Sequence, residues 1–148
     1  VEQLYDSLII ATRADKAGQE NYEQAQEQRE QWMLEFMRIF GGNDDDEPTL
    51  FSGTIPQALM LMNGKLTADA TSLENSRTLR AVVEAPFLGN EERLETLYLA
   101  ALSRQPRSEE AEFLLKHVDS KTSEADRQEA FAEIFWGILN SPEFVLSR

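Results

Sequence analysis

The clearest pattern in this chain lies in residues 94–106, LETLYLAALSRQP. The apolar residues there recur at intervals of three and four positions, which is the spacing of one face of an α-helix. Pro106 has no backbone N–H with which to continue a helix, so the helix must end before it. The stretch predicts an amphipathic helix whose buried face is Leu94, Leu97, Tyr98, Ala101 and Leu102.

Two more helices and a short turn are expected after Pro106. Ser108 is expected to cap one helix, and Ser123, with Asp126 three residues later, to cap the next. Asn140 and the Ser141-Pro142 pair then end that helix and begin a final short turn. The expected buried residues are Ala111, Leu114, Leu115 and Val118, then Phe131, Ile134, Phe135, Ile138 and Leu139, and finally Phe144 and Leu146.

Residues 1–90 show the same period less regularly. A longer helix is expected over residues 22–40, with Arg29 as the one polar member of its apolar face, and it stops at two glycines. Thr54 and Gln57 have the spacing of a capping box for a helix that ends near residue 64. Short apolar stripes are also formed by Leu4, Tyr5, Leu8 and Ile9, and by Leu73, Leu79, Val82 and Val83.

No segment alternates with period two, so we predict no sheet. The expected architecture is all-α: a compact bundle of about six to seven short helices, forming one domain over residues 1–148 with an acidic loop at 41–53. The apolar fraction of 41% and the charged fraction of 28% are typical of a globular protein. Because the first residue is valine, we expect the chain to be a piece of a larger protein.

The charge balance restricts the class of partner. The chain has 27 acidic and 14 basic residues, a formal net charge of -13, which repels nucleic acid and anionic membrane surfaces. No apolar run approaches the ~20 residues that a membrane-spanning helix requires. We therefore expect a protein partner, or other domains of the parent protein.

The sequence contains no recognisable catalytic centre. There is no cysteine, which excludes thiolate catalysis and zinc-thiolate sites. The one histidine, His117, has no nucleophile elbow with it and is expected to have a surface or capping role near a helix end. The Glu91-Glu92 and Glu109-Glu110 pairs are expected to be solvated first-turn carboxylates. We therefore predict that the chain is not an enzyme and holds no resident cofactor.

Two features leave alternatives open. Asp44, Asp45, Asp46 and Glu47 form an acidic loop that is either solvated charge or a weak calcium site, although the spacing does not match an EF-hand. Trp32 and Trp136 lie on or beside apolar stripes, which favours core packing over stacking on a sugar.

Five motifs in order resemble one known family. They are EQLYDSL at 2–8, the segment from Phe36 to Gly41, TIPQALMLMNG at 54–64, LYLAALSRQPRSEE at 97–110 and FWGILNSPEF at 135–144. Together they resemble the C-terminal domain of unknown function of large planctomycete cytochrome-c-associated proteins. The resemblance implies an extracytoplasmic setting, in the periplasm or at the cell surface. It implies no haem here, because the chain has no Cys-x-x-Cys-His signal.

A looser similarity links residues 94–146 to phycobilisome-linker-like helical modules, which are assembly units, and this favours interaction over catalysis. Within the motifs, Arg104 is hard to explain as a surface residue, and we expect a buried pairing with a carboxylate such as Glu143. The leading hypothesis is a non-catalytic interaction or scaffolding module of a larger exported protein. The alternatives are a calcium-binding extracellular module and a polysaccharide-hydrolase-associated domain with paired acids.

Overall fold

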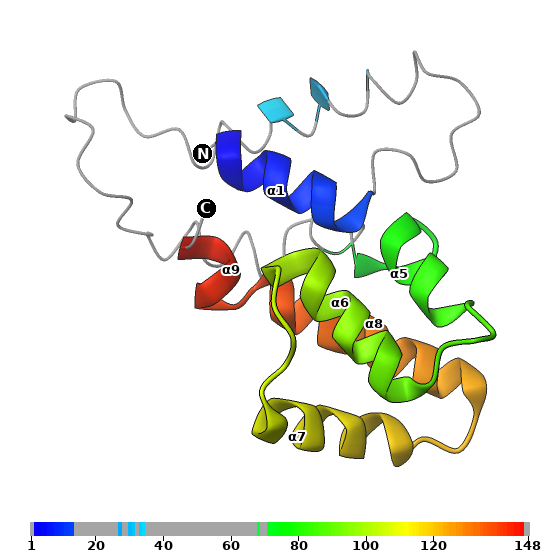
Figure 1. Ribbon diagram of the computed structural model, residues 1–148. Helices are drawn as coiled ribbons and strands as arrows, with labels where there is room; N and C mark the ends of the chain where they lie inside the picture. The colour runs from blue at the N-terminus through cyan, green and yellow to red at the C-terminus, as the bar shows by residue number, and fades with distance from the viewer. Residues whose placement is uncertain are drawn as a thin grey trace.

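The computed structural model describes residues 2–13 and 71–146, together with residues 27, 30, 31, 33, 34 and 68. The elements of this part of the chain are α1 (Glu2–Thr12), α5 (Arg77–Val83), α6 (Asn90–Leu102), α7 (Ser108–Asp119), α8 (Glu124–Leu139) and α9 (Pro142–Leu146). Six helices and no strand occur among these residues, which confirms the all-α expectation for them (Figure 1).

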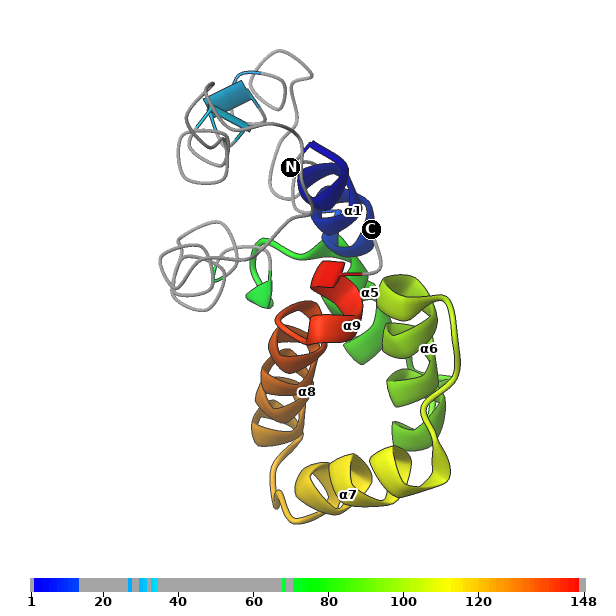
Figure 2. The ribbon, with the colours of Figure 1, turned by 90° about the vertical axis from the view of Figure 1, so that its left-hand side faces the viewer.

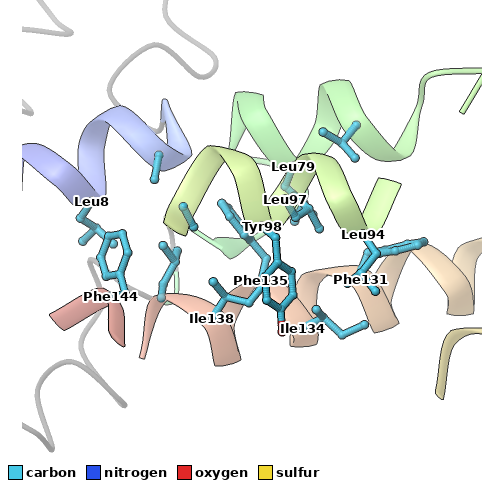
Figure 3. Close-up of a cluster of buried hydrophobic side chains, with 14 of the residues drawn as sticks. Leu8, Leu79, Leu94, Leu97, Tyr98, Phe131, Ile134, Phe135, Ile138 and Phe144 are labelled. Atoms are coloured by element: carbon cyan, nitrogen blue, oxygen red, sulfur yellow. The ribbon is translucent and has the colours of Figure 1, made fainter. Parts of the chain in front are cut away.

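Helix α6 is the centre of the bundle. It contacts α1, α5, α7, α8 and α9, and α7 lies across the end of α6 and α8 that is far from α1 (Figure 2). Its predicted face is buried except for Leu102, which is partly buried, and Leu94, Leu97 and Ala101 are fully enclosed. The facing side chains of α8 include Phe131 and Phe135, which pack against that face (Figure 3). Burial of these apolar side chains is the main force that holds the helices together.

The first helix belongs to the same core although it is far away in sequence. Tyr5 and Leu8 of α1 are buried, and Leu8 lies beside Phe144 of α9 (Figure 3). A buried serine adds a polar link: the Ser76 hydroxyl donates to the Thr12 carbonyl at 3.0 Å and accepts from the Leu79 N–H at 3.2 Å. Ser76 therefore caps α5 and joins it to the end of α1.

Two of the three predicted caps after Pro106 are confirmed. The Ser123 hydroxyl accepts from the Asp126 N–H at 3.0 Å, and the Ser141 hydroxyl accepts from the Phe144 N–H at 3.2 Å. The cap at Ser108 is wrong by one position, because Ser108 is the first residue of α7 and the residue before it is the N-cap. The Glu110 carboxylate accepts from the Arg107 N–H at 2.7 Å, which is the bond that a glutamate at the third helical position makes in a capping box.

Several sequence predictions fall outside the described residues. They are most of the 22–40 helix, the 41–53 loop with its acidic residues, and the 54–64 helix with Thr54 and Gln57. Residues 27, 30, 31, 33 and 34 have helical backbone, as expected. Among the described helices, none is long and apolar enough to cross a membrane.

Candidate functional site

An open groove of about 400 Å³ lies between α6, α7 and α8. On α7, the residues that face it are Glu110, Phe113, Leu114 and His117, which have the spacing of one helical face. The apolar lining of the groove is formed by Tyr98, Leu102, Phe113, Leu114, Ile134 and Ile138.

Two residues of the groove face open space. Gly137 lies on the α8 wall, and a Cβ atom added there would meet nothing within 4 Å. Phe113 stands at the rim with 74% of its surface exposed. An exposed aromatic side chain beside an apolar groove is more common at binding sites than on the rest of a protein surface.

Arg104 closes one end of the groove. Its Nε and Nη2 donate to the two carboxylate oxygens of Glu143 at 2.6 and 2.7 Å. Its Nη1 and Nη2 donate to the two oxygens of Glu110 at 2.9 and 3.0 Å. The guanidinium carbon also lies 5.3 Å from the centroid of the Tyr98 ring. The expected pairing with Glu143 is therefore present, although the Arg104 side chain keeps 25% of its surface exposed and is not fully buried.

The arginine controls the protonation of both carboxylates. Hydrogen bonds from Arg104 are the largest cause that lowers the pKa of Glu110 to about 2, and the Arg107 backbone N–H adds to the effect. Hydrogen bonding to Arg104 also lowers the pKa of Glu143. The expectation that Glu110 is a freely solvated first-turn carboxylate is therefore wrong, because Glu110 is bound to a side chain six positions earlier. Both carboxylates stay ionised near neutral pH.

His117 and Glu133 connect the walls of the groove at another point. The His117 Nε2 atom lies 2.8 Å from Glu133 Oε2, and this contact joins the last turn of α7 to α8. The position of the histidine in the last turn is the one that the sequence predicted. The Ser120 hydroxyl donates to the His117 backbone carbonyl at 2.7 Å.

A second hollow of about 550 Å³ adjoins the groove along α8. Its lining includes Glu129, Ala132, Glu133 and Trp136, and Glu133 lines the groove as well. Trp136 is partly buried, so one part of the indole packs and another part faces the hollow. The Asn140 amide donates to the Trp136 carbonyl at 2.8 Å and closes the end of α8.

The structure brings together only some of the residues that the sequence singled out. Arg104 and Glu143 meet at one end of the groove, and Trp136 and Asn140 meet at the end of α8. Trp32, Thr54, Gln57 and the acidic residues 44–47 lie outside the described residues. Within the described part of the chain, no group of three or more His, Asp or Glu side chains is placed to hold a metal ion.

Sequence reasoning missed Gly137, Glu129 and Glu133 as groove or hollow residues. A glycine within a helical pattern is a detectable signal, since it costs helix stability and so needs a reason. The glutamates carry no such signal, because exposed acidic residues are common throughout this chain.

Comparisons with known proteins do not assign the chain to a family. No family model, no curated protein and no solved structure matches it.

Proposed function

We propose that this chain is a non-catalytic helical interaction module of a larger protein, and that the groove between α6, α7 and α8 receives an apolar side chain of a protein partner. The single observation that carries the proposal is the open apolar cavity of about 400 Å³ beside the exposed ring of Phe113. This volume is within the usual range for binding pockets, about 300–1,000 Å³. Protein interfaces gain most of their affinity from a few large side chains that enter such hollows.

The electrostatics of the groove support binding rather than hydrolysis. A glycosidase needs one carboxyl group whose raised pKa keeps it protonated as a general acid. Glu110 and Glu143 are shifted in the opposite direction by Arg104. Arg104 also joins the start of α7 to α9, so its hydrogen bonds favour a preformed groove that loses little entropy when a partner binds.

An extracytoplasmic setting belongs to the proposal and rests on the resemblance to the planctomycete domain family. The family resemblance and the similarity to linker-like modules both favour an assembly role. The calcium alternative rests on residues 44–47 alone, and it is tested separately by unfolding experiments.

The proposal can be tested by selecting a displayed library of random peptides on the immobilised chain. Gly137→Trp fills the groove with an indole, whereas Gly137→Ala adds only a methyl group where there is space. We expect the enriched peptides to bind the original chain and Gly137→Ala, and to lose binding to Gly137→Trp. Circular dichroism and thermal unfolding would establish that both variants are folded.

Enriched peptides that bind all three proteins equally would show that the groove is not the docking surface. Phe113→Asp provides a second variant at the rim, where the residue is already exposed and the change does not disturb the core. The affinity of Phe113→Asp for the enriched peptides should fall as well, because a carboxylate replaces the apolar ring that the partner would cover.

A further inference from the structure

We infer that the occupant of the groove is a basic amphipathic segment of a partner protein, with an apolar side chain in the groove and a lysine or arginine beside Trp136, between Glu129 and Glu133. This inference rests on the proposed function and specifies the chemistry of the partner. It is carried by the charge and composition of the hollow that adjoins the groove.

Two exposed carboxylates of the hollow have the same sign and lie close together. Glu129 and Glu133 are four residues apart on α8, so they occupy neighbouring positions on one helix face and repel each other. Among the described residues, Glu133 contacts His117, and Glu129 forms no salt bridge with a lysine or arginine. A bound cation would relieve the repulsion between the two glutamates.

Trp136 makes the hollow more specific than an acidic surface. It lies seven residues after Glu129, on the same face of α8. Tryptophan is the aromatic residue that attracts lysine and arginine most strongly through its ring face. Carboxylates beside an indole therefore suit a cationic side chain with an alkyl stem, which can pack on the ring while its charged end meets the glutamates.

The hollow and the groove are adjacent, so one segment can occupy both. Glu133 lines the two cavities, and Trp136 and Gly137 follow each other in the chain with one facing each cavity. Glu133 of the hollow and Gly137 of the groove are four residues apart on α8, and positions at that spacing are about 5–6 Å apart on a helix surface. An apolar and a basic residue of the partner would therefore be separated by a similar distance.

The charge of the surrounding chain favours a basic occupant over a second copy or a polyanion. Residues 104–143 contain nine acidic and five basic residues, and the whole chain carries a net charge of -13. A second copy would bring the same negative charge to the interface, and polyanions such as nucleic acid would be repelled. A basic polypeptide segment would be attracted by the negative potential of this surface.

The experiment uses synthetic helical peptides, acetylated and amidated at their ends. The reference peptide carries two leucines four residues apart and a lysine immediately before each leucine, which places the lysines along one flank of the apolar stripe. The matched peptide has the same composition, but each lysine is moved to two positions after its leucine and thus to the opposite face. Titration calorimetry at low and high salt measures the affinity of each peptide.

We expect the reference peptide to bind about ten-fold more tightly than the matched peptide at low salt, and the difference to shrink at high salt. Glu129→Gln and Glu133→Gln should each weaken its binding several-fold. Glu112→Gln is the matched control, because Glu112 is exposed on α7 and does not line either cavity. The indole N–H resonance of Trp136, assigned with Trp136→Phe, should shift when the reference peptide binds.

Equal affinities of the two peptides, or no effect of either glutamate substitution, would overturn the inference. Display-selected peptides that require the groove but carry no basic residue would overturn it while leaving the proposed function standing. Failure of the proposed function itself would look different, because Gly137→Trp would then leave the binding of every peptide unchanged. A concentration-dependent dimer that Gly137→Trp dissociates would identify a second copy as the occupant and would also overturn the inference.

Discussion

Replacing Arg104 with methionine is expected to lower the free energy of unfolding by about 2 kcal/mol. Methionine keeps an unbranched apolar stem, is shorter than arginine, and removes the charge and the donors of the side chain. The two hydrogen bonds to Glu110, in a partly exposed pair, contribute ~1–1.5 kcal/mol. The contact over the Tyr98 ring adds ~0.5–1 kcal/mol. The exposed Glu143 pair is left out of this sum.

Urea and thermal unfolding at neutral pH would measure the change. For a chain of this length each kcal/mol corresponds to about 2–4 °C, so the midpoint should fall by about 4–8 °C. Arg80→Met is the matched control, because Arg80 forms a helical pair with Glu84 in which its side chain is 59% exposed. That control should change stability by less than ~0.5 kcal/mol. If Arg104→Met lowered the free energy of unfolding no more than Arg80→Met does, the contacts of Arg104 with α7 and α9 would not stabilise the fold.

The same substitution should alter how stability depends on pH. The folded-state pKa of Glu110 is about 2, against an ordinary value of 4.5, so its contribution is complete above pH 4.5 and is lost as the pH falls toward 2. The lowered pKa of Glu143 acts in the same direction. The stability difference between the original chain and Arg104→Met should therefore shrink across this window. A difference that stays constant to the acid end would contradict the assignment of Arg104 as the cause.

Three further predictions concern the core, a helix cap and the acidic loop. Leu97→Ala removes a fully buried side chain at the centre of α6 and should cost ~2–5 kcal/mol in urea unfolding, whereas Leu99→Ala on the exposed side should cost far less. Ser123→Ala removes the acceptor for the Asp126 N–H and should cost ~1 kcal/mol, and Ser123→Asp should restore most of it. If residues 44–47 bind calcium, excess calcium should raise the thermal midpoint above that in EDTA, and Asp44→Asn with Asp45→Asn should abolish the rise. No change with calcium would identify the loop as solvated charge.

The helices were predictable because their signals are local. The stripe from Leu94 to Leu102 and the caps at Ser123 and Ser141 depend on residues within a few positions of each other. The cap at Ser108 was misplaced for a related reason. Glu110 accepts from the Arg107 N–H, as the glutamate at the third helical position does in a capping box, so Arg107 is the N-cap and Ser108 is the first helical residue.

The candidate site was predictable only in part. Arg104 and Glu143 lie 39 residues apart, and their pairing was inferred because an arginine at the end of an apolar helix needs a partner. The pairing of Glu110 with Arg104 is not predictable in this way, because the helix dipole alone explains a glutamate in the first turn. The role of Gly137 depends on what faces it across the groove, which its own neighbours in the sequence do not specify.

By itself, the sequence determined the helical class, the buried face of α8, most of that of α6 and most helix ends of the described residues. These follow from apolar periodicity and from hydrogen bonds between near neighbours, which every helix must satisfy on its own. On α7 only Val118 of the predicted face is buried, and Ala111, Leu114 and Leu115 are partly buried. Only the tertiary structure decided that α7 lies across the ends of α6 and α8, leaving an apolar groove with Arg104 at one end and a carboxylate and indole hollow beside it. The physical reason is that contacts between helices depend on their crossing angles and separations, and many arrangements of the same apolar faces satisfy one periodic pattern.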